Sequence, residues 1–527
     1  MQYDENAPFN SGTMAEDWER YNDAAGLDLS ERFARYTDPA LMQDPLSQGL
    51  AMSSPDAIYR DFQSLGAILL NNLAAKMSGL LFPMDRPNFR LVANDELKKY
   101  AGEQGWDESQ LNASMAALEQ QASDRLYYGN SYVKLQRAVK LCIVTGGCVM
   151  YRDAEMGSFV VWNRHSYRMR RAPFGRVTEC IIKQRFEPNA LPNAFKEDVL
   201  RILESGRLEQ AIDIYTRVSF KESTIPNMPR IATIMHEVEG KLLPSSVSTF
   251  PEHLCPIYFP VWSVQDGEHY GRGLVETMSG DFAKLSALSE QLALYEIDSL
   301  SMLNVVDTAS ANNLDSYRTA RTGQFVEGPP QAITAYDRGD YNKIAAISSD
   351  LSALERRLSQ AFMYAGTQRD SERTTALEVS LVAQEADAAL GGAYSQLAES
   401  MQAPAAYLTL SELGDEVANT LINRHYRPVI MSGAQALNRA GITQRLVKVA
   451  QYAQAAVQVL TTVDRTLDPT KLLTLIATNE GINLDEFKKT PEQLRQEAEA
   501  QQAQAAAQAQ ASSALLQQST DAQAALQ

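Results

Sequence analysis

The five histidines are the first residues to consider for chemistry, because imidazole serves both as a base and as a metal ligand. His236 and Glu237 begin a run like the HExxH zinc motif, but residue 240 is glycine, so the second histidine ligand is absent. The histidines never come within four residues of one another; they are His165, His236, His253, His269 and His425. A zinc site assembled from distant histidines stays open, and isolated core or surface histidines are the favoured interpretation.

Motifs for phosphate binding and for nucleophilic catalysis are missing as well. The chain holds no GxxxxGK[ST] sequence, and its Gly240-Lys241 pair is followed by Leu242, which argues against a P-loop ATPase. No GxSxG elbow occurs, and Cys142 and Cys148 lie six residues apart, the wrong spacing for a CxxC metal knuckle. We therefore predict a protein that is not an enzyme and that holds no cofactor and no metal.

Composition places the chain among ordinary globular proteins. Its 527 residues predict two to four folding units, and 45% hydrophobic residues are enough for a real core. Four cysteines do not make a disulfide framework, so we expect Cys142, Cys148, Cys180 and Cys255 to be reduced and buried in a protein folded in a cytoplasm. The acidic N-terminus lacks a signal sequence, and no apolar run of about 18 residues predicts a membrane span.

The net charge of -17 limits the ways in which the chain could interact with nucleic acid. A protein that grips DNA needs a concentrated basic surface, because it neutralises phosphates and releases their counterions. An acidic protein is compatible instead with DNA that slides past without sticking. The composition alone does not decide between such a channel and an ordinary soluble acidic protein.

Three segments that contain clustered arginines stand out against this acidic background. Residues 167–176 read YRMRRAPFGR, which predicts either a nucleic-acid patch or, in a strand-rich region, a contact with a partner subunit. Arg318, Arg321 and Arg338 lie in or beside a run of short extended segments, where they could meet an acidic partner or DNA. Residues 366–373 read GTQRDSER, a charge-balanced stretch that by itself indicates a surface loop.

Hydrophobic periodicity divides the N-terminal half into helices followed by strands. Helices are predicted over 55–82, 108–128 and 130–144, and Pro83 ends the first of them. From residue 146 to about 265 the pattern changes to short β-like runs such as SFVVWN and ECIIKQRF. This half therefore predicts a helical lobe joined to an antiparallel sheet.

The C-terminal half predicts two helices that bracket a small β insertion. The first covers 281–300 with Asp281 as its cap, and the second carries the stripe Leu351, Leu354, Leu358 and Phe362 with Asp350 as its cap. Between them, residues 303–336 hold short extended runs. After the GTQRDSER loop, Thr375 and Glu378 form a capping box for a long helix with a kink at Gly391-Gly392, and further helices follow.

Several segments together are similar to the portal (head-to-tail connector) proteins of short-tailed bacteriophages. The resembling blocks are SLGAILLNNLAAKMSGLLFPMDRPNFRL (64–91), YGRGLVETMSGDFAKLSALSEQ (270–291), RTGQFVEG (321–328), and the run from Leu354 to Gln402 that includes LGGAYSQLAESMQ. Their order and spacing agree with the family from about residue 15 to 480. No single block is a catalytic fingerprint, so the signal lies in their collinearity.

The resemblance implies an α+β, predominantly helical portal fold. Its parts would be a wing over 1–275 (a helical lobe plus an antiparallel sheet), stem helices over 276–302 and 338–364, a β-containing clip over 303–337, a tunnel loop over 365–375, the wing's long helix and return over 376–432, and a helical crown over 433–495. The Gln/Ala-rich tail, 496–527, departs from the family pattern, and we expect at best a frayed helix there.

The resemblance also implies partners and site residues. The chain would form a homododecameric ring at one capsid vertex of the virion, assembled in the bacterial host cytoplasm, through which double-stranded DNA passes without sequence specificity. Further partners would be the terminase large subunit, tail adaptor and tubular tail proteins, the major capsid and scaffolding proteins, and internal core proteins at the crown, with no membrane. In the tunnel loop Arg369, Asp370, Glu372 and Arg373 would face DNA; in the clip Asn312, Asn313, Arg318 and Arg321 would meet the terminase or tail adaptor.

Two other classes of function compete with this reading. The acidic charge and the Gln/Ala tail also suit a helical scaffolding or interaction protein of the virion without a ring or a channel. An enzyme, either a nuclease or an ATPase, is the third class, and the missing motifs argue against it. The mass of the purified particle discriminates between the first two.

Overall fold

Two units make up the chain, residues Met1–Leu437 and residues Asn438–Gln527. The computed structural model describes part of the first unit, namely residues 13–45, 62–84, 87–127, 131–187, 191, 193–202, 211–222, 230–243, 246–299, 302–306, 319, 333–337, 341–364, 390, 392–422 and 429–431. The second unit, which includes most of the expected crown and all of the tail, lies outside the described residues.

The N-terminal segment folds into three short helices: α1 (Met14–Arg20), α2 (Ala24–Arg35) and the 3-10 turn η1 (Pro39–Met42). A capping box starts α1, since the Thr13 side chain accepts from the Glu16 N–H and the Glu16 side chain accepts from the Thr13 N–H. The backbone N–H groups of Met14 and Ala15 then donate to the carboxylate of Glu237, which fastens α1 to the sheet. The sequence Thr-Met-Ala-Glu is the signature of this capping box, and we did not predict the helix from it.

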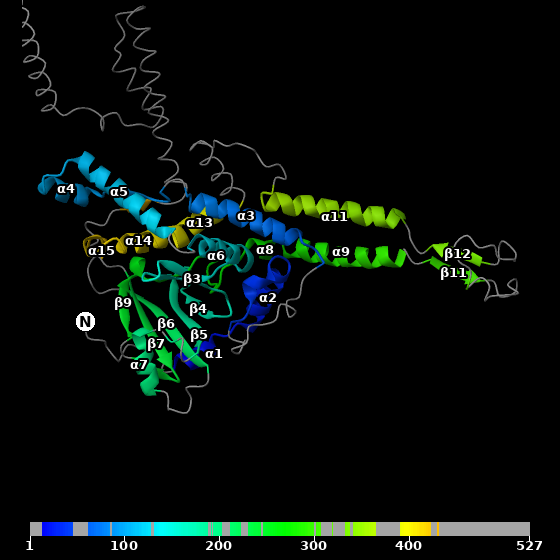
Figure 1. The fold of residues 1–527 in the computed structure, drawn as a ribbon, viewed down its shortest axis with the longest axis horizontal. Helices are drawn as coiled ribbons and strands as arrows, with labels where there is room; N and C mark the ends of the chain where they lie inside the picture. Colours follow the sequence, from blue (N-terminus) through cyan, green and yellow to red (C-terminus); the bar gives the residue numbers. More distant parts are fainter. Residues whose placement is uncertain are drawn as a thin grey trace, which may run out of the picture. The chain divides into compact units, whose positions relative to one another are not determined.

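A helical core surrounds α3 (Leu65–Leu81) and α6 (Ser131–Thr145), which pack on each other (Figure 1). Leu69, Leu73 and Met77 of α3 are fully buried there, as the predicted stripe requires. The helix begins at Leu65, so the prediction of helix before that residue is wrong for 62–64, and residues 55–61 lie outside the described part. Phe62, which we placed in the stripe, is exposed because it precedes the helix.

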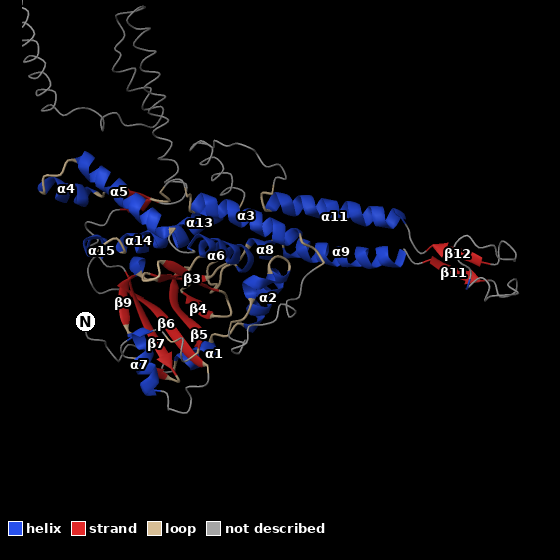
Figure 2. Ribbon diagram, viewed as in Figure 1, coloured by secondary structure: helices blue, strands red, loops and turns tan. Residues whose placement is uncertain are grey.

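Antiparallel sheets form the strand-rich region (Figure 2). The larger sheet has the order β4-β5-β6-β7-β8, with β9 also paired to β7. Its strands are β4 (Tyr167–Arg171), β5 (Val177–Phe186), β6 (Ile212–Glu222), β7 (Arg230–Val238), β8 (Lys241–Leu242) and β9 (Ser248–Pro251). A smaller sheet orders β10-β2-β3, from β2 (Val149–Asp153), β3 (Ser158–Trp162) and β10 (Ile257–Tyr258). The predicted antiparallel sheet is thus confirmed; the helix α7 (Asn193–Ile202) between β5 and β6 was not predicted.

A second helical layer joins residues far apart in the sequence. Helix α5 (Glu108–Leu126) packs against α14 (Ala403–Ser411), and β1 (Arg90–Val92) pairs with β13 (Val429–Met431). The remaining elements of this layer are α4 (Asp95–Glu103), the 3-10 turn η5 (Glu252–Leu254), α13 (Ala393–Leu397), the π-helical turn η6 (Ala398–Gln402) and α15 (Asp415–Ile422). Gly392 adopts φ +84° directly before α13; the helix that we predicted to precede it lies outside the described residues, so the kink at Gly391-Gly392 stays a prediction.

The predicted helix–strand–strand–helix order is confirmed in the remaining segment. After the short helix α8 (Leu274–Thr277) come α9 (Ser279–Ser299), β11 (Met302–Val306), β12 (Ile333–Asp337) and α11 (Tyr341–Ala361). β11 and β12 pair antiparallel, from Met302 opposite Asp337 to Val306 opposite Ile333. The two helices lie side by side and carry this strand pair between them in the chain (Figure 1).

Candidate functional site

The helix pair α9 and α11 positions the segments that the sequence singled out, so its packing is the starting point. Phe282 and Leu285 on α9 share one buried cluster with Leu358 on α11, and Phe362 joins it just beyond the end of α11. Leu354, one turn earlier on α11, is also buried. The rings of Phe282 and Phe362 meet edge to face with centroids 5.8 Å apart, an arrangement that aromatic quadrupoles favour. The predicted apolar stripes are therefore correct.

Charged residues pair across the same two helices. Asp281 binds Arg357, and Lys284 lies 3.8 Å from Asp350. Neither aspartate is the helix cap that we predicted. Asp281 lies in the first turn of α9, which begins at Ser279, and Asp350 lies in the middle of α11, because Ile344 and Ile347 continue the apolar stripe toward Tyr341.

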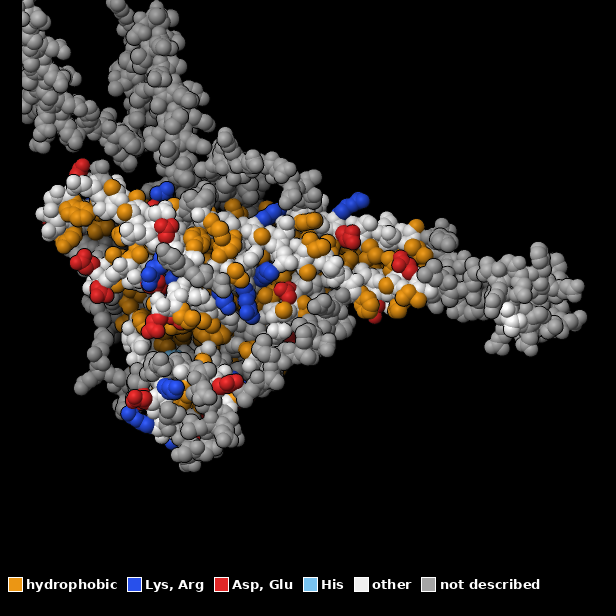
Figure 3. All heavy atoms as spheres, in the orientation of Figure 1, with side chains coloured by type: hydrophobic (Ala, Val, Ile, Leu, Met, Phe, Trp, Pro, Cys, Tyr) orange, Lys and Arg blue, Asp and Glu red, His pale blue; other side chains and the backbone are white. Residues whose placement is uncertain are grey.

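A second apolar stripe runs along α9 on the face that does not contact α11. We call it the outer stripe, and it consists of Ala283, Ala287, Leu294 and Ile297. Their spacings of four, seven and three residues place them on one helix face. Leu294 is 53% and Ile297 68% exposed, and hydrophobic side chains are visible on the surface along the helix pair in Figure 3. An elongated helix that buries one stripe and exposes another indicates a further packing partner.

The segment Tyr270-Gly271-Arg272-Gly273 fixes the approach to α8 and α9. The Cα of Gly271 approaches Gly146 so closely that a Cβ would collide with the Gly146 carbonyl, and the Arg272 N–H donates to the Ser263 carbonyl at 2.8 Å. Gly273 is likewise pressed against the carbonyl of Ile143. Only glycine fits these two positions. The close backbone contacts therefore explain why glycine occurs twice in the segment Tyr270-Gly271-Arg272-Gly273.

The C-terminal end of α11 lies beside the start of α9, where Phe362 meets Phe282, and it forms a tight turn that we call the exit turn (Ser359–Tyr364). The N–H of Met363 donates to Gln360 O at 3.1 Å, and the N–H of Tyr364 donates to Ser359 O at 2.7 Å. Met363 has φ +52°, a left-handed conformation that costs a residue with a Cβ about 1–2 kcal/mol. No sequence signal marks it, because glycine normally occupies this place and the next glycine is Gly366.

The residues that we predicted to contact DNA and packaging or tail proteins lie outside the described part of the chain. These are Arg369, Asp370, Glu372 and Arg373 in the loop, and Asn312, Asn313, Arg318 and Arg321 between β11 and β12. The same holds for the capping box at Thr375 and Glu378 and for the helices expected after residue 432. Their roles therefore stay predictions.

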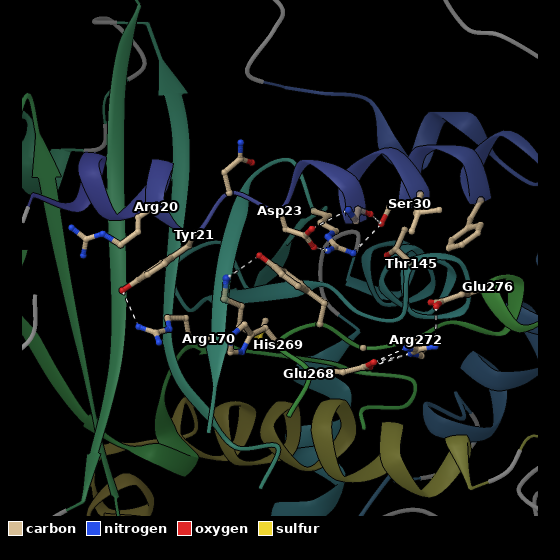
Figure 4. A pocket seen from close by; sticks show the side chains of 18 residues that line it. Arg20, Tyr21, Asp23, Ser30, Thr145, Arg170, Glu268, His269, Arg272 and Glu276 are labelled. Atoms are coloured by element: carbon tan, nitrogen blue, oxygen red, sulfur yellow. Dashed lines mark hydrogen bonds and ion pairs between the residues drawn. The ribbon is translucent and has the colours of Figure 1, made fainter. Parts of the chain in front are cut away.

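A cleft of about 670 Å³ opens where α2, β4 and residues 268–276 meet (Figure 4). Its charged side chains bind one another. Arg272 pairs with Glu268 at 2.6 Å and with Glu276 at 3.5 Å, while Arg164 pairs with Asp23. Hydrogen bonds from Arg272 lower the pKa of Glu268, whereas burial raises that of Glu276.

Hydroxyl and imidazole groups in this cleft are engaged with the backbone. Ser30 Oγ donates to Gly26 O at 2.8 Å and Thr145 Oγ donates to Leu141 O at 2.9 Å. His269 Nδ1 accepts from the Arg171 N–H at 3.2 Å, so its lone pair is occupied. A nucleophile needs a base within hydrogen-bond reach, and these groups do not provide that pair.

The basic run on β4 is also used inside the protein. Arg168 is buried, with its guanidinium 4.3 Å above the Trp18 ring, and burial lowers its pKa. Arg170 donates to Tyr21 Oη, and Arg171 donates to the carbonyls of His269 and Gly175. Three arginines are thus committed to intramolecular contacts, which argues against a nucleic-acid patch on this strand.

The described residues contain no group of three or more His, Cys, Asp or Glu side chains that could hold a metal ion. The four cysteines are free and buried, as predicted. Within the described part, no helix combines the length and the hydropathy that crossing a membrane requires.

Comparison with known proteins shows which family this chain belongs to. A family model described as bacteriophage head to tail connecting protein matches residues 14–485. The portal protein of Pseudomonas phage phiKMV is 39% identical over 514 residues, covering 98% of this chain and 99% of that protein. The portal protein of Escherichia phage T7 is 28% identical over 512 residues, covering 94% and 91%. Among solved structures, a chain in the virion of a native gene transfer agent particle aligns with TM-score 0.38 and 10% identity over 80% of this chain and 90% of that one. The chain belongs to the family of bacteriophage head to tail connecting proteins.

Proposed function

We propose that this connector works as one subunit of a closed dodecameric ring that conducts double-stranded DNA into and out of the phage head. Family membership gives the connector role and a structural, non-enzymatic protein. The ring and the channel are our proposal. They account for a chain of net charge -17 that must handle DNA without gripping it.

The outer stripe of α9 is the observation that most supports a ring. A helix pair with an exposed apolar face needs a partner, and in a head-to-tail ring that partner is the next copy of the same chain. Each subunit would then present its outer stripe to its neighbour, and the helix pairs would together line the channel. The portal parts follow from this: α9 and α11 as the stem, β11 and β12 in the clip, and residues 365–375 as the tunnel loop.

In this proposal the ring sits at one vertex of the virion capsid, assembled in the host cytoplasm. The clip, with Asn312, Asn313, Arg318 and Arg321, would bind the terminase large subunit during packaging and tail adaptor or tubular tail proteins afterwards. The major capsid and scaffolding proteins would surround the wing, and internal core proteins would meet the crown at 433–495. The tunnel-loop residues Arg369, Asp370, Glu372 and Arg373 would face the DNA.

Mass measurement tests the ring directly. Light scattering of the purified protein should give about twelve times the 58.3 kDa chain mass, or thirteen times for rings assembled outside the virion. A monomer or a dimer would refute the ring and favour a helical scaffolding protein without a channel.

A deletion tests the channel separately. Removing residues 368–372 should leave the ring mass unchanged and reduce the amount of DNA that particles package or retain. Particles of normal genome content built with the deletion variant would contradict the assignment of this loop to the channel.

A further inference from the structure

The exit turn is held from outside by one side chain. Lys76, on α3, donates from Nζ to the carbonyl oxygen of Met363 at 2.6 Å. The two residues are 287 positions apart in the sequence, so this is a tertiary contact between α3 and the end of α11. The left-handed conformation of Met363 is what turns its carbonyl away from the helix axis, where a neighbouring helix can reach it.

The Lys76 ammonium group is a suitable donor for a carbonyl at the C-terminal end of a helix. Met363 lies two residues after the end of α11, so its carbonyl takes no part in the hydrogen bonds of the helix, and an ammonium group near a helix C-terminus also interacts favourably with the helix dipole. A hydrogen bond from a charged donor is also stronger than one between neutral groups. The burial of part of the Lys76 side chain lowers its pKa, as expected for an ammonium group held against protein rather than in water.

Both flanks of the contact are fixed. Phe362, directly before Met363, is fully buried against Phe282, and Met363 and Tyr364 pack against the same core. On the other side, Met77 next to Lys76 is fully buried in α3. The hydrogen bond therefore joins two rigid elements, and residue 365 follows one peptide bond after the last residue of this anchored turn.

We infer that Lys76 is a positioning residue for the 365–375 segment: by holding the Met363 carbonyl, it sets the point and direction at which the chain leaves α11. This inference rests on the proposed function, because that segment is the proposed tunnel loop. Lys76 itself need not touch DNA.

Trypsin cleavage of the assembled particle tests the positioning without any DNA. Arg369 and Arg373 are cleavage sites within the segment, and mass spectrometry can follow each of them. In Lys76→Met the rate of cleavage at both sites should rise about fivefold, the factor that the loss of one hydrogen bond corresponds to. Lys76→Arg keeps a cationic donor and should restore the wild-type rate. Unchanged cleavage in an intact Lys76→Met particle would overturn the inference.

A second pair of variants guards against loss of folding in Lys76→Met. Met363→Gly accepts the left-handed conformation and should keep wild-type cleavage, whereas Met363→Val, with its β-branch, resists it and should behave like Lys76→Met. Glycine loses more packing than valine, so a loss of packing alone would raise cleavage more in Met363→Gly, the reverse of the expected order. Equal cleavage in the two variants would count against the inference.

DNA content of particles separates this inference from the proposed function. If the 368–372 deletion lowers genome content and cleavage in Lys76→Met stays at the wild-type rate, the positioning role is wrong and the channel stands. If the deletion does not lower genome content, the channel assignment fails, while the cleavage rates still report whether Lys76 holds the turn.

Discussion

Arg152 of β2 and Glu412, the residue that follows α14, form a two-pronged ion pair in the interior: Nε lies 2.8 Å from Oε1 and Nη2 lies 3.0 Å from Oε2. The two side chains are 1% and 7% exposed. Arg125 of α5 adds a third group, with Nε 2.7 Å from the same carboxylate. One carboxylate at the end of α14 thus joins a strand of the small sheet to α5.

Breaking this pair should cost stability. Arg152→Met leaves Glu412 buried beside only the half-exposed Arg125, so we expect a loss of about 3–5 kcal/mol in the free energy of unfolding, measured by urea denaturation. The exposed pair Arg201–Glu197 is the control, and Arg201→Met should change that free energy by less than about 0.5 kcal/mol. Similar changes in the free energy of unfolding for the two substitutions would show that the buried ion pair contributes no more to stability than the exposed one.

The pH dependence of stability should carry a contribution from His236. Burial lowers the pKa of His236 to about 4, and its Nδ1 lies 2.8 Å from Thr216 Oγ1. An unfolded histidine titrates near pH 6.5, so between pH 6.5 and 4 the unfolded chain binds a proton that the folded chain does not. Stability should therefore fall as the pH drops through this window, by at most about 3 kcal/mol from this group.

His236→Gln removes that titration and keeps a polar group near Thr216. The free energy of unfolding of the variant should fall less between pH 6.5 and 4.5 than that of the wild type. Parallel pH profiles for the two proteins would mean that His236 titrates normally in the fold.

The close approach of Gly271 to Gly146 should make Gly271 intolerant of any side chain. A Cβ at 271 would collide with the Gly146 carbonyl and with Val261, and it would lie 2.9 Å from the Ser263 carbonyl. Because backbone atoms form two of these three contacts, Gly271→Ala should lose about 1–3 kcal/mol.

Gly79→Ala is the matched control for that substitution. Gly79 lies in α3, and nothing would come within 4 Å of its added Cβ. Replacing a helical glycine at an open position should raise stability by about 0.5–1 kcal/mol. The melting temperature should therefore fall for Gly271→Ala and rise for Gly79→Ala. A shift in the same direction for both variants would contradict the close approach of Gly271 to Gly146.

The outer stripe should control assembly rather than folding. Ile297→Glu together with Leu294→Glu places charges on an exposed face, so the circular dichroism of the chain should stay unchanged. In a ring those charges would be buried against the next copy, and we expect the particle mass to drop toward that of single chains. Met156→Glu, which changes an even more exposed apolar residue in the β2–β3 turn, should leave the mass unaffected. A full-mass ring from the double variant would place the subunit contact elsewhere.

The sequence by itself determined the type and order of most described elements. Stripes such as Phe282 and Leu285 on α9 and Leu354 and Leu358 on α11 follow from helical periodicity, and alternating runs such as SFVVWN follow from the pleat of a strand. The collinear blocks indicated the portal family, and the comparisons confirm it. These features are readable because each depends on residues that are neighbours in the chain.

Only the tertiary structure decided what each charged residue does. Asp281 and Asp350 are of a residue type that often caps helices, but in the structure they pair with Arg357 and Lys284 across the helix pair. The clustered arginines of β4 suggest a nucleic-acid patch, but in the structure they contact Tyr21, Trp18 and His269. Lys76 and Met363 carry no local signal at all. Ion pairs and turns that join distant segments depend on how the elements pack, and local periodicity holds no information about that packing.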